Sequence, residues 1–122
     1  MNYLHRLMVS HHDHLADWLS EGKPGSFQAF LDAHDPDFSL VTVHGELLDL
    51  AALRSGLSRG GGSRPGLRIR ISDMTHLIPG VCQFREQHEV DNRVVDMRIV
   101  TAVVRDGRVL GLQETARPVA ED

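Results

Sequence analysis

Features that define several large functional classes are scarce in this sequence of 122 residues. It has one cysteine, Cys82, so no internal disulfide can form, and this usage suits a reducing cytoplasm. No apolar run approaches the roughly 18 residues of a membrane span. The formal net charge is -4 and the 13 basic residues are scattered, whereas phosphate-backbone binding needs a basic stripe. We therefore expect a cytoplasmic protein with neither a membrane nor a nucleic acid as a partner.

Motifs for metals, cofactors and secretion are also missing. No H-E-x-x-H pattern accompanies the N-terminal histidines, and the stretch GGGSRPG lacks the Gly-Lys-Ser/Thr ending of a phosphate-binding loop. The N-terminus, MNYLHRLMVSHHDH, has charges and histidines within its apolar spacing, which is not typical of a secretory signal. We therefore expect no metal and no cofactor, and we interpret residues 58–66 as a linker or a lid over a pocket.

What is present is an ordinary globular composition, with 41% hydrophobic and 25% charged residues. A chain of this length fits one domain, which we assign to residues 1–122. It can form a core without disulfide or metal support. No internal repeat or composition shift marks a boundary within it.

The first half of the chain is predicted to be mostly helical. Apolar residues spaced by three and four predict an amphipathic helix over residues 3–20, which the stretch EGKPG ends. Ser26 is a suitable N-cap for a second helix over residues 27–34, and Asp49 for a third over residues 50–57.

The second half of the chain alternates as β-strands do, and one further strand falls in the first half. The predicted strands cover residues 38–43, 67–72, 81–90, 94–105 and 108–119. Pro79-Gly80 and Asp106-Gly107 mark turns, and the second of these is a strong signal for a two-residue hairpin. Helices followed by a strand meander favour an α+β architecture, with the helices packed on one face of an antiparallel sheet.

The longest predicted strand, over residues 94–105, is apolar on both faces between Val95 and Val103. One face can lie under the helices, but the other also needs a cover, and a second copy of the chain is the simplest candidate. We therefore expect a homodimer that forms through the outer face of the sheet.

A family resemblance is carried by this order of elements together with four stretches: PDFSLVTVHGELLD, FREQHEV, RIVTAVVRDGRV and GLQETARP. The chain resembles the nuclear transport factor 2-like superfamily, which includes ketosteroid isomerase and SnoaL-like polyketide cyclases, and is most similar to a bacterial branch of it. The resemblance spans almost the whole chain. It implies a cone, in which a curved antiparallel sheet wraps around N-terminal helices, a pocket opens at one end and homodimers form through the outer face. It does not settle the function, because this superfamily includes enzymes, binders and scaffolds.

The first predicted helix places a histidine where a leucine is expected. His11 lies within the apolar stripe, and in a cone fold that stripe faces the concave side of the sheet. His11 therefore either lines the pocket or is a neutral core histidine bonded to a backbone carbonyl. Trp18 lies further along the same face, as core or as pocket wall. We expect His5, His12 and His14 to be solvated.

Two neighbouring strands carry a second group of candidate residues. If residues 91–93 form a three-residue loop, Glu86 lies opposite Arg98 and His88 opposite Asp96, which gives two favourable charge pairs on one face. Polar groups that converge above an apolar floor are typical of a pocket. The alternative is a salt-bridge ladder on a surface that faces solvent or a second subunit.

The floor of that face would be apolar, with Cys82 and Phe84 among its residues. We expect Cys82 itself to be buried and inert. The candidate pocket residues are therefore His11, Trp18, Phe84, Glu86, His88 and Arg98.

The opposite face of the sheet carries a different pairing. The two-residue hairpin at residues 106–107 places Ile99 opposite Glu114. Glu114 then lies away from the candidate pocket residues, diagonally across from Arg85.

Two functions from different classes are compatible with these candidates, and we prefer the first narrowly. A pocket protein that binds a small apolar molecule needs only the cavity and a few orienting polar groups.

An isomerase- or cyclase-type enzyme that removes a proton next to a carbonyl needs a base and neutral donors. Asp37 or His88 could be that base and His11 a donor, but no motif assigns a catalytic residue. The single tyrosine, Tyr3, is at the N-terminus, which argues against the tyrosine-assisted mechanism of ketosteroid isomerase. A third possibility is an interaction scaffold with a filled cavity.

Overall fold

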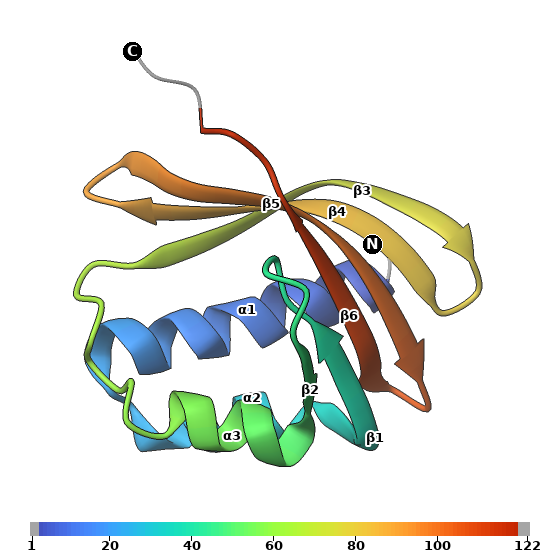
Figure 1. The fold of residues 1–122 in the computed structure, drawn as a ribbon, viewed down its shortest axis with the longest axis horizontal. Helices are drawn as coiled ribbons and strands as arrows, with labels where there is room; N and C mark the ends of the chain where they lie inside the picture. The colour runs from blue at the N-terminus through green and yellow to red at the C-terminus, as the bar shows by residue number, and fades with distance from the viewer. Residues whose placement is uncertain (1–2, 120–122) are drawn as a thin grey trace.

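Residues 3–119 are described by a computed structural model, in which three helices lie on the concave side of a curved six-stranded sheet (Figure 1). The helices are α1 (Tyr3–Glu21), α2 (Pro24–Asp32) and α3 (Leu50–Leu57). The strands are β1 (His34–Val41), β2 (Leu47–Asp49), β3 (Arg68–Ile78), β4 (Val81–Val90), β5 (Arg93–Arg105) and β6 (Arg108–Ala116). Their order across the sheet is β2-β1-β6-β5-β4-β3. The expected α+β cone is confirmed.

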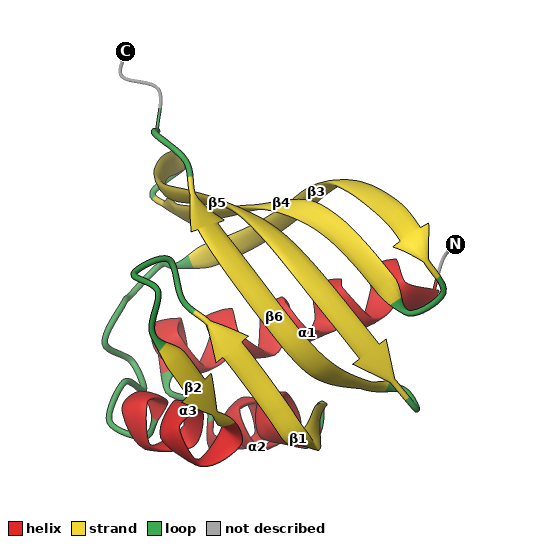
Figure 2. Cartoon of the chain, turned by 45° about the vertical axis from the view of Figure 1, so that its right-hand side comes forward, coloured by secondary structure: helices red, strands yellow, loops and turns green. Residues whose placement is uncertain are grey.

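The sheet is mostly, but not entirely, antiparallel. β1, which lies next to the edge strand β2, runs parallel to β6, and Figure 2 shows their arrows pointing the same way. The prediction of an all-antiparallel sheet is therefore wrong for this pair. These two strands are not joined by a hairpin, so their relative direction is set by where α2 delivers the chain into β1 and not by a turn.

The helix boundaries follow local sequence signals. The predicted bounds of α3 are confirmed, and the Asp49 carboxylate caps it by accepting a hydrogen bond from the Ala52 N–H at 2.8 Å. The prediction that Ser26 caps α2 is wrong, because Lys23 is the N-cap and Pro24 begins the helix. Proline is favoured at this first helical position, since its fixed φ suits the helix and its missing N–H costs no hydrogen bond there.

The β4–β5 hairpin has a different turn from the predicted one but the predicted register. Val90 pairs with Arg93 across a two-residue turn whose residues, Asp91 and Asn92, have φ values of 52° and 63°. The three-residue loop is therefore wrong. A β-bulge directly after His88 restores the register, and the predicted Glu86–Arg98 and His88–Asp96 pairings are confirmed.

The β5–β6 hairpin has the predicted turn but a shifted register. A bulge follows the first pairs, so that Val103 pairs with Gly111 and Ile99 with Thr115. The predicted pairing of Ile99 with Glu114 is therefore wrong. A one-residue slip turns every later side chain to the other face, so Glu114 lies on the concave side. On the convex side Arg85 instead forms an ion pair with Asp73, with Nη1 and Oδ2 3.5 Å apart.

The main core fills the space between α1 and the centre of the sheet. Met8, Phe84 and Val100 are at most 1% exposed there. Cys82 is a free thiol in the same core, and burial raises its pKa, which keeps it unreactive. Among the described residues, no helix combines the length and apolar character needed to cross a membrane.

Candidate functional site

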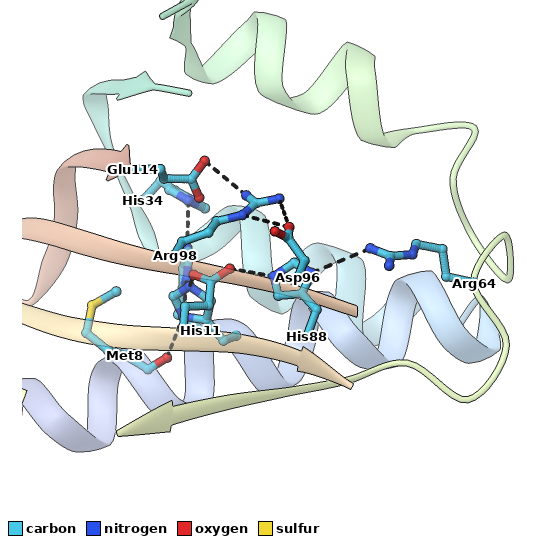
Figure 3. Close-up of polar contacts among 10 residues, drawn as sticks. Met8, His11, His34, Arg64, His88, Asp96, Arg98 and Glu114 are labelled. Atoms are coloured by element: carbon cyan, nitrogen blue, oxygen red, sulfur yellow. Dashed lines mark hydrogen bonds and ion pairs between the residues drawn. The ribbon is translucent and has the colours of Figure 1, made fainter. Parts of the chain in front are cut away.

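A cavity of about 330 Å³ lies between the helices and the concave face of the sheet. Much of its wall is apolar, with contributions from Leu15, Leu19, Phe30, Leu53 and Leu57. The rest is formed by a cluster of histidine, arginine and glutamate side chains from α1, β1, β4, β5, β6 and the loop before β3 (Figure 3). One cavity therefore joins an apolar lining to an unusual density of buried polar groups.

Glu86, on β4, is the centre of this polar cluster and is only 2% exposed. Its Oε1 atom lies 2.7 Å from Nε2 of His12, and its Oε2 atom accepts a hydrogen bond from Nε2 of His88. Burial alone would raise the pKa of the Glu86 carboxyl, but the charge and hydrogen bonds of His12 and His88 outweigh burial and hold the pKa well below its usual range. Glu86 is therefore an ionised carboxylate inside the protein.

His12, on α1, is the partner that carries the compensating positive charge. Its Nδ1 lies 2.8 Å from the Met8 carbonyl oxygen, and its Nε2 faces the Glu86 carboxylate. Both neighbours are acceptors, so both ring nitrogens carry a proton. Burial opposes this charged form, but the Glu86 charge and hydrogen bond, and then the Met8 carbonyl, raise the pKa of His12 overall.

His11 and His34 extend the cluster as two neutral rings. Nδ1 of His34 lies 3.2 Å from the Leu31 carbonyl oxygen and donates to it, so Nε2 of His34 accepts from Nε2 of His11 at 2.9 Å. Nδ1 of His11 then faces the protonated Nδ1 of His12 at 3.3 Å. Burial lowers the pKa of both His11 and His34, consistent with this assignment.

Arg98, on β5, forms a second charged group in the cavity wall. Its Nε and Nη2 atoms donate to Oδ2 of Asp96 at 3.0 and 2.6 Å, and its Nη1 donates to Oε1 of Glu114 at 3.1 Å. Burial raises the pKa of Glu114, and Arg98 counteracts this only in part. Each of the three nitrogens of the Arg98 guanidinium thus donates to a carboxyl group.

Arg64 reaches the cavity from the glycine-rich loop between α3 and β3. Its Nη1 lies 3.5 Å from Nδ1 of His88, a long and therefore weak contact (Figure 3). The loop backbone is pinned to the C-terminal end of α1, because the N–H groups of Gly62 and Arg64 donate to the Trp18 and Leu19 carbonyls at 3.0 and 2.8 Å. Residues 58–66 are thus tied down beside the cavity.

The structure places the six candidate residues in two groups. His11, Glu86, His88 and Arg98 come together at the cavity wall. Trp18 and Phe84 do not line this cavity and support it from outside. Trp18 stacks on Phe27 with ring centroids 4.5 Å apart and donates to the Leu57 carbonyl at 2.9 Å.

Phe84 lies beneath the histidine cluster and not in the cavity wall. It is 1% exposed and meets the His12 ring edge to face, with centroids 5.7 Å apart. Asp37, considered as a base, is exposed and accepts a hydrogen bond from Arg105 at 3.1 Å, away from this cavity.

Sequence reasoning missed several residues of the site, among them His12, His34, Arg64 and Glu114. The expectation that His12 is solvated is wrong, since it is 3% exposed. A signal was available, because Leu4, Met8, His12 and Ala16 repeat every four residues along α1 and all four are buried. No local pattern indicates that Arg64 reaches His88 across the cavity.

Metal binding has no support in the arrangement of these groups. Within residues 3–119, no three or more His, Cys, Asp or Glu side chains are grouped so that they could hold a metal ion. The geometry instead favours proton-sharing contacts between nitrogen and oxygen atoms.

Comparisons with known proteins give the family. The chain is similar to a solved NTF-2-like protein of unknown function from Pseudomonas aeruginosa, with 31% identity, a TM-score of 0.88, and coverage of 96% of this chain and 100% of that one. The fold also matches a candidate SnoaL-like isomerase from Agrobacterium tumefaciens (9% identity, TM-score 0.74, 97% and 100% covered). A candidate ketosteroid isomerase from Kribbella flavida matches as well (12% identity, TM-score 0.69, 98% and 82% covered).

Two other searches, against family models and against curated proteins, found no match. The match to the Pseudomonas protein spans nearly the whole of both chains at 31% identity. The other two similarities show the fold alone, since their identities are 9% and 12%. The chain therefore belongs to the nuclear transport factor 2-like family.

Proposed function

We propose that this protein binds a small molecule with an apolar body and one polar group in the cavity between α1, α3 and the sheet. The observation that carries the proposal is the ionised Glu86 carboxylate, which is buried with His12 and His88 at the wall of an otherwise largely apolar space. A volume of about 330 Å³ falls at the small end of ligand pockets, which span roughly 300–1,000 Å³.

The rigidity of the polar cluster supports a binding role. Glu86 is held by an ion pair with His12 and a hydrogen bond from His88, so a ligand meets groups whose orientation is fixed before it arrives. Preorganised groups reduce the entropy lost on binding. A few fixed polar groups in an apolar cavity can orient a ligand while the apolar wall supplies most of the affinity.

The binding proposal is tested by calorimetric titration with two simple alcohols, 1-octanol and 4-phenyl-1-butanol. We expect saturable binding at one site per chain. Leu53→Trp, which fills the cavity wall at α3, should weaken binding at least about tenfold. Leu47→Trp is the matched control, because Leu47 is 74% exposed and lies outside the cavity lining. Absence of saturable binding, or equal affinity in Leu53→Trp, would count against the proposal.

We further propose that the protein acts as a homodimer through the convex face of the sheet. Met97, Ile99 and Val103 point to this face from β5, opposite the buried Val100 side, and Val103 is 36% exposed. These apolar side chains share the face with Thr101, which accepts a hydrogen bond from Gln83, and together they favour a covering partner.

A second candidate function is acid–base catalysis next to a carbonyl, and the Glu86–His88 contact favours it. Nε2 of His88 donates to Glu86, which leaves Nδ1, 3.5 Å from Nη1 of Arg64, as the unprotonated nitrogen of the ring. A carboxylate that fixes the tautomer of a histidine in this way orients it as a general base. Glu86 itself is a poor base, because its pKa is held low.

The enzyme candidate is tested by incubating the protein with cyclic ketones in D₂O and following exchange of the hydrogens next to the carbonyl by NMR. We expect faster exchange than in buffer alone and a return to the buffer rate in His88→Gln. His76→Gln, on the exposed end of β3, is the control and should exchange like the wild type. Exchange at the buffer rate in the wild type would remove this candidate.

A further inference from the structure

The cavity contains one arginine whose charge has no carboxylate partner. Arg64 is half-buried and lines the cavity, and its side chain contacts a histidine nitrogen 3.5 Å away. No aspartate or glutamate among residues 3–119 lies within ion-pair distance of it. Guanidinium groups at protein sites usually pair with carboxylates or phosphates, because their planar N–H pairs match two oxygen atoms.

Most other charged groups at the cavity wall have a partner of opposite charge. Glu86 is paired with His12, and Arg98 is paired with Asp96 and Glu114. Neither Glu86 nor Glu114 pairs with Arg64, and no ion pair joins Arg64 to Glu46, the third acidic residue of the lining. Among residues 3–119, the Arg64 guanidinium on the loop side of the cavity therefore has no carboxylate partner.

The backbone around Arg64 is held in place, so the position of its side chain follows from the fold. The Arg64 N–H donates to Leu19 at 2.8 Å, and its carbonyl accepts from the Leu67 N–H at 3.1 Å. Gly61 packs directly on the Trp18 ring, with no room for a Cβ atom. This loop is therefore fixed to α1 at the arginine and just before it, and the side chain extends toward His88 (Figure 3).

We propose that Arg64 is the recognition site for a carboxylate, and that the ligand of this protein is a small amphipathic carboxylic acid. The acid group would lie against the Arg64 guanidinium, which has N–H donors to spare beyond its weak contact with His88. The apolar body would pack on the leucines of α1 and α3, such as Leu15, Leu53 and Leu57. This inference rests on the proposed binding function and names the chemical class of the ligand.

The test compares acids with alcohols of the same shape. Octanoate and 1-octanol, and 4-phenylbutyrate and 4-phenyl-1-butanol, are titrated calorimetrically into the wild type at pH 7.5. We expect each acid to bind at least about tenfold more tightly than its alcohol, the effect of one charge-assisted hydrogen bond. Higher salt should reduce this preference and leave alcohol affinity unchanged.

Three variants test whether Arg64 causes the preference for acids over alcohols. Arg64→Gln should lose the acid preference, so that each acid binds about as tightly as its alcohol, and Arg64→Lys should keep part of the preference, since lysine retains the charge without the paired N–H geometry. Arg59→Gln is the matched control, because Arg59 is an exposed arginine of the same loop that does not line the cavity. Wild-type circular dichroism and a wild-type thermal unfolding midpoint show that Arg64→Gln is folded.

The outcomes separate the inference from the function on which it rests. Acid preference in the wild type that disappears in Arg64→Gln and persists in Arg59→Gln supports the inference. Alcohol binding without acid preference, or a preference that survives in Arg64→Gln, overturns the inference alone. Absence of binding by all four probes overturns both the inference and the proposed function.

Discussion

The buried imidazoles on α1 are tolerated because each of them has a polar partner in the same cluster. A single buried histidine without a partner costs free energy, and an uncompensated buried charge costs more. Here His11 and His34 remain neutral and bond to each other, while the charge on His12 meets that of Glu86. The set is therefore polar inside but nearly free of net charge, which is why a helix can place imidazoles where leucines are usual.

Removing the Glu86 charge should strongly destabilise the fold. Glu86→Gln leaves His12 without its counter-charge, and breaking one side of a buried ion pair costs about 3–5 kcal/mol. Glu89→Gln is the control on the same strand, since Glu89 pairs at 3.2 Å with Arg70, whose side chain is 65% exposed, and such a pair contributes less than about 1 kcal/mol. Urea unfolding at pH 7 measures both. Equal losses in the two variants would contradict a buried pair at Glu86.

The pH dependence of stability should have a maximum near pH 6.5. The pKa values of His11 and His34 are lowered in the folded state, so below pH 6.5 the unfolded chain takes up protons that the folded chain does not, and stability is lost as pH falls. The pKa of His12 is raised, so its contribution is present below pH 6.5 and is lost as pH rises through its folded value.

The loss of stability below pH 6.5 can be assigned to particular histidines by substitution. Each fully linked group contributes at most about 1.4 kcal/mol per pH unit. His34→Gln should therefore make the decline between pH 6.5 and pH 5 distinctly shallower, because glutamine can still accept from His11 but takes up no proton. Urea midpoints across pH 5–8 provide the measurement, and a flat wild-type profile below pH 6.5 would be inconsistent with neutral buried rings.

At the level of strands, the sequence predicts which segments form strands and where the hairpins turn better than it predicts which residues pair across them. The bounds of β4 and the turn at Asp106-Gly107 follow from alternation and turn chemistry. The bulge between Val103 and Val104 has no signature in a single sequence, and it alone moves Glu114 to the cavity side. The Glu86–Arg98 pairing was predicted correctly from charge complementarity although the turn was not, since charge pairs constrain register independently of loop length.

The loop between α3 and β3 depends on a glycine that touches Trp18. A Cβ atom at Gly61 would lie 2.5–2.8 Å from atoms of the Trp18 ring, so Gly61→Ala must displace the ring or the loop. We expect a loss of about 1–3 kcal/mol, as for other overpacked sites, and a shift in tryptophan emission, because Trp18 is the single tryptophan of the chain.

A second glycine provides the comparison for this loop. A Cβ atom added at Gly56, in α3, would meet no atom within 4 Å, so Gly56→Ala should keep the wild-type emission and gain up to about 1 kcal/mol from helix propensity. Thermal unfolding and fluorescence spectra distinguish the two variants. An unchanged spectrum in Gly61→Ala would show that Trp18 does not hold the loop.

On the scale of the whole molecule, the order of elements was enough to predict the α+β class, the family resemblance implied the cone, and neither predicted its interior. Amphipathic helices followed by a meander leave few ways to bury one apolar face, so the α+β class follows from pattern alone. The choice of concave face does not, because residues 95–103 are apolar on both sides. It is decided by α1 packing over Cys82, Phe84 and Val100, a long-range contact that periodicity cannot assign.

The same two-sided strand gives the last prediction, that the chain is a dimer through its convex face. Ile99→Lys places a charge in the middle of that face, where burial of an unpaired ammonium would be strongly unfavourable, and should yield monomers. Leu47→Lys, on the edge strand β2 and 74% exposed, should leave the assembly unchanged. Sedimentation velocity over a range of concentrations reports the mass of each. A wild-type monomer at high concentration would contradict the prediction, because Met97, Ile99 and Val103 on the convex face would then have no covering partner. Dimers that persist in Ile99→Lys would place the interface elsewhere.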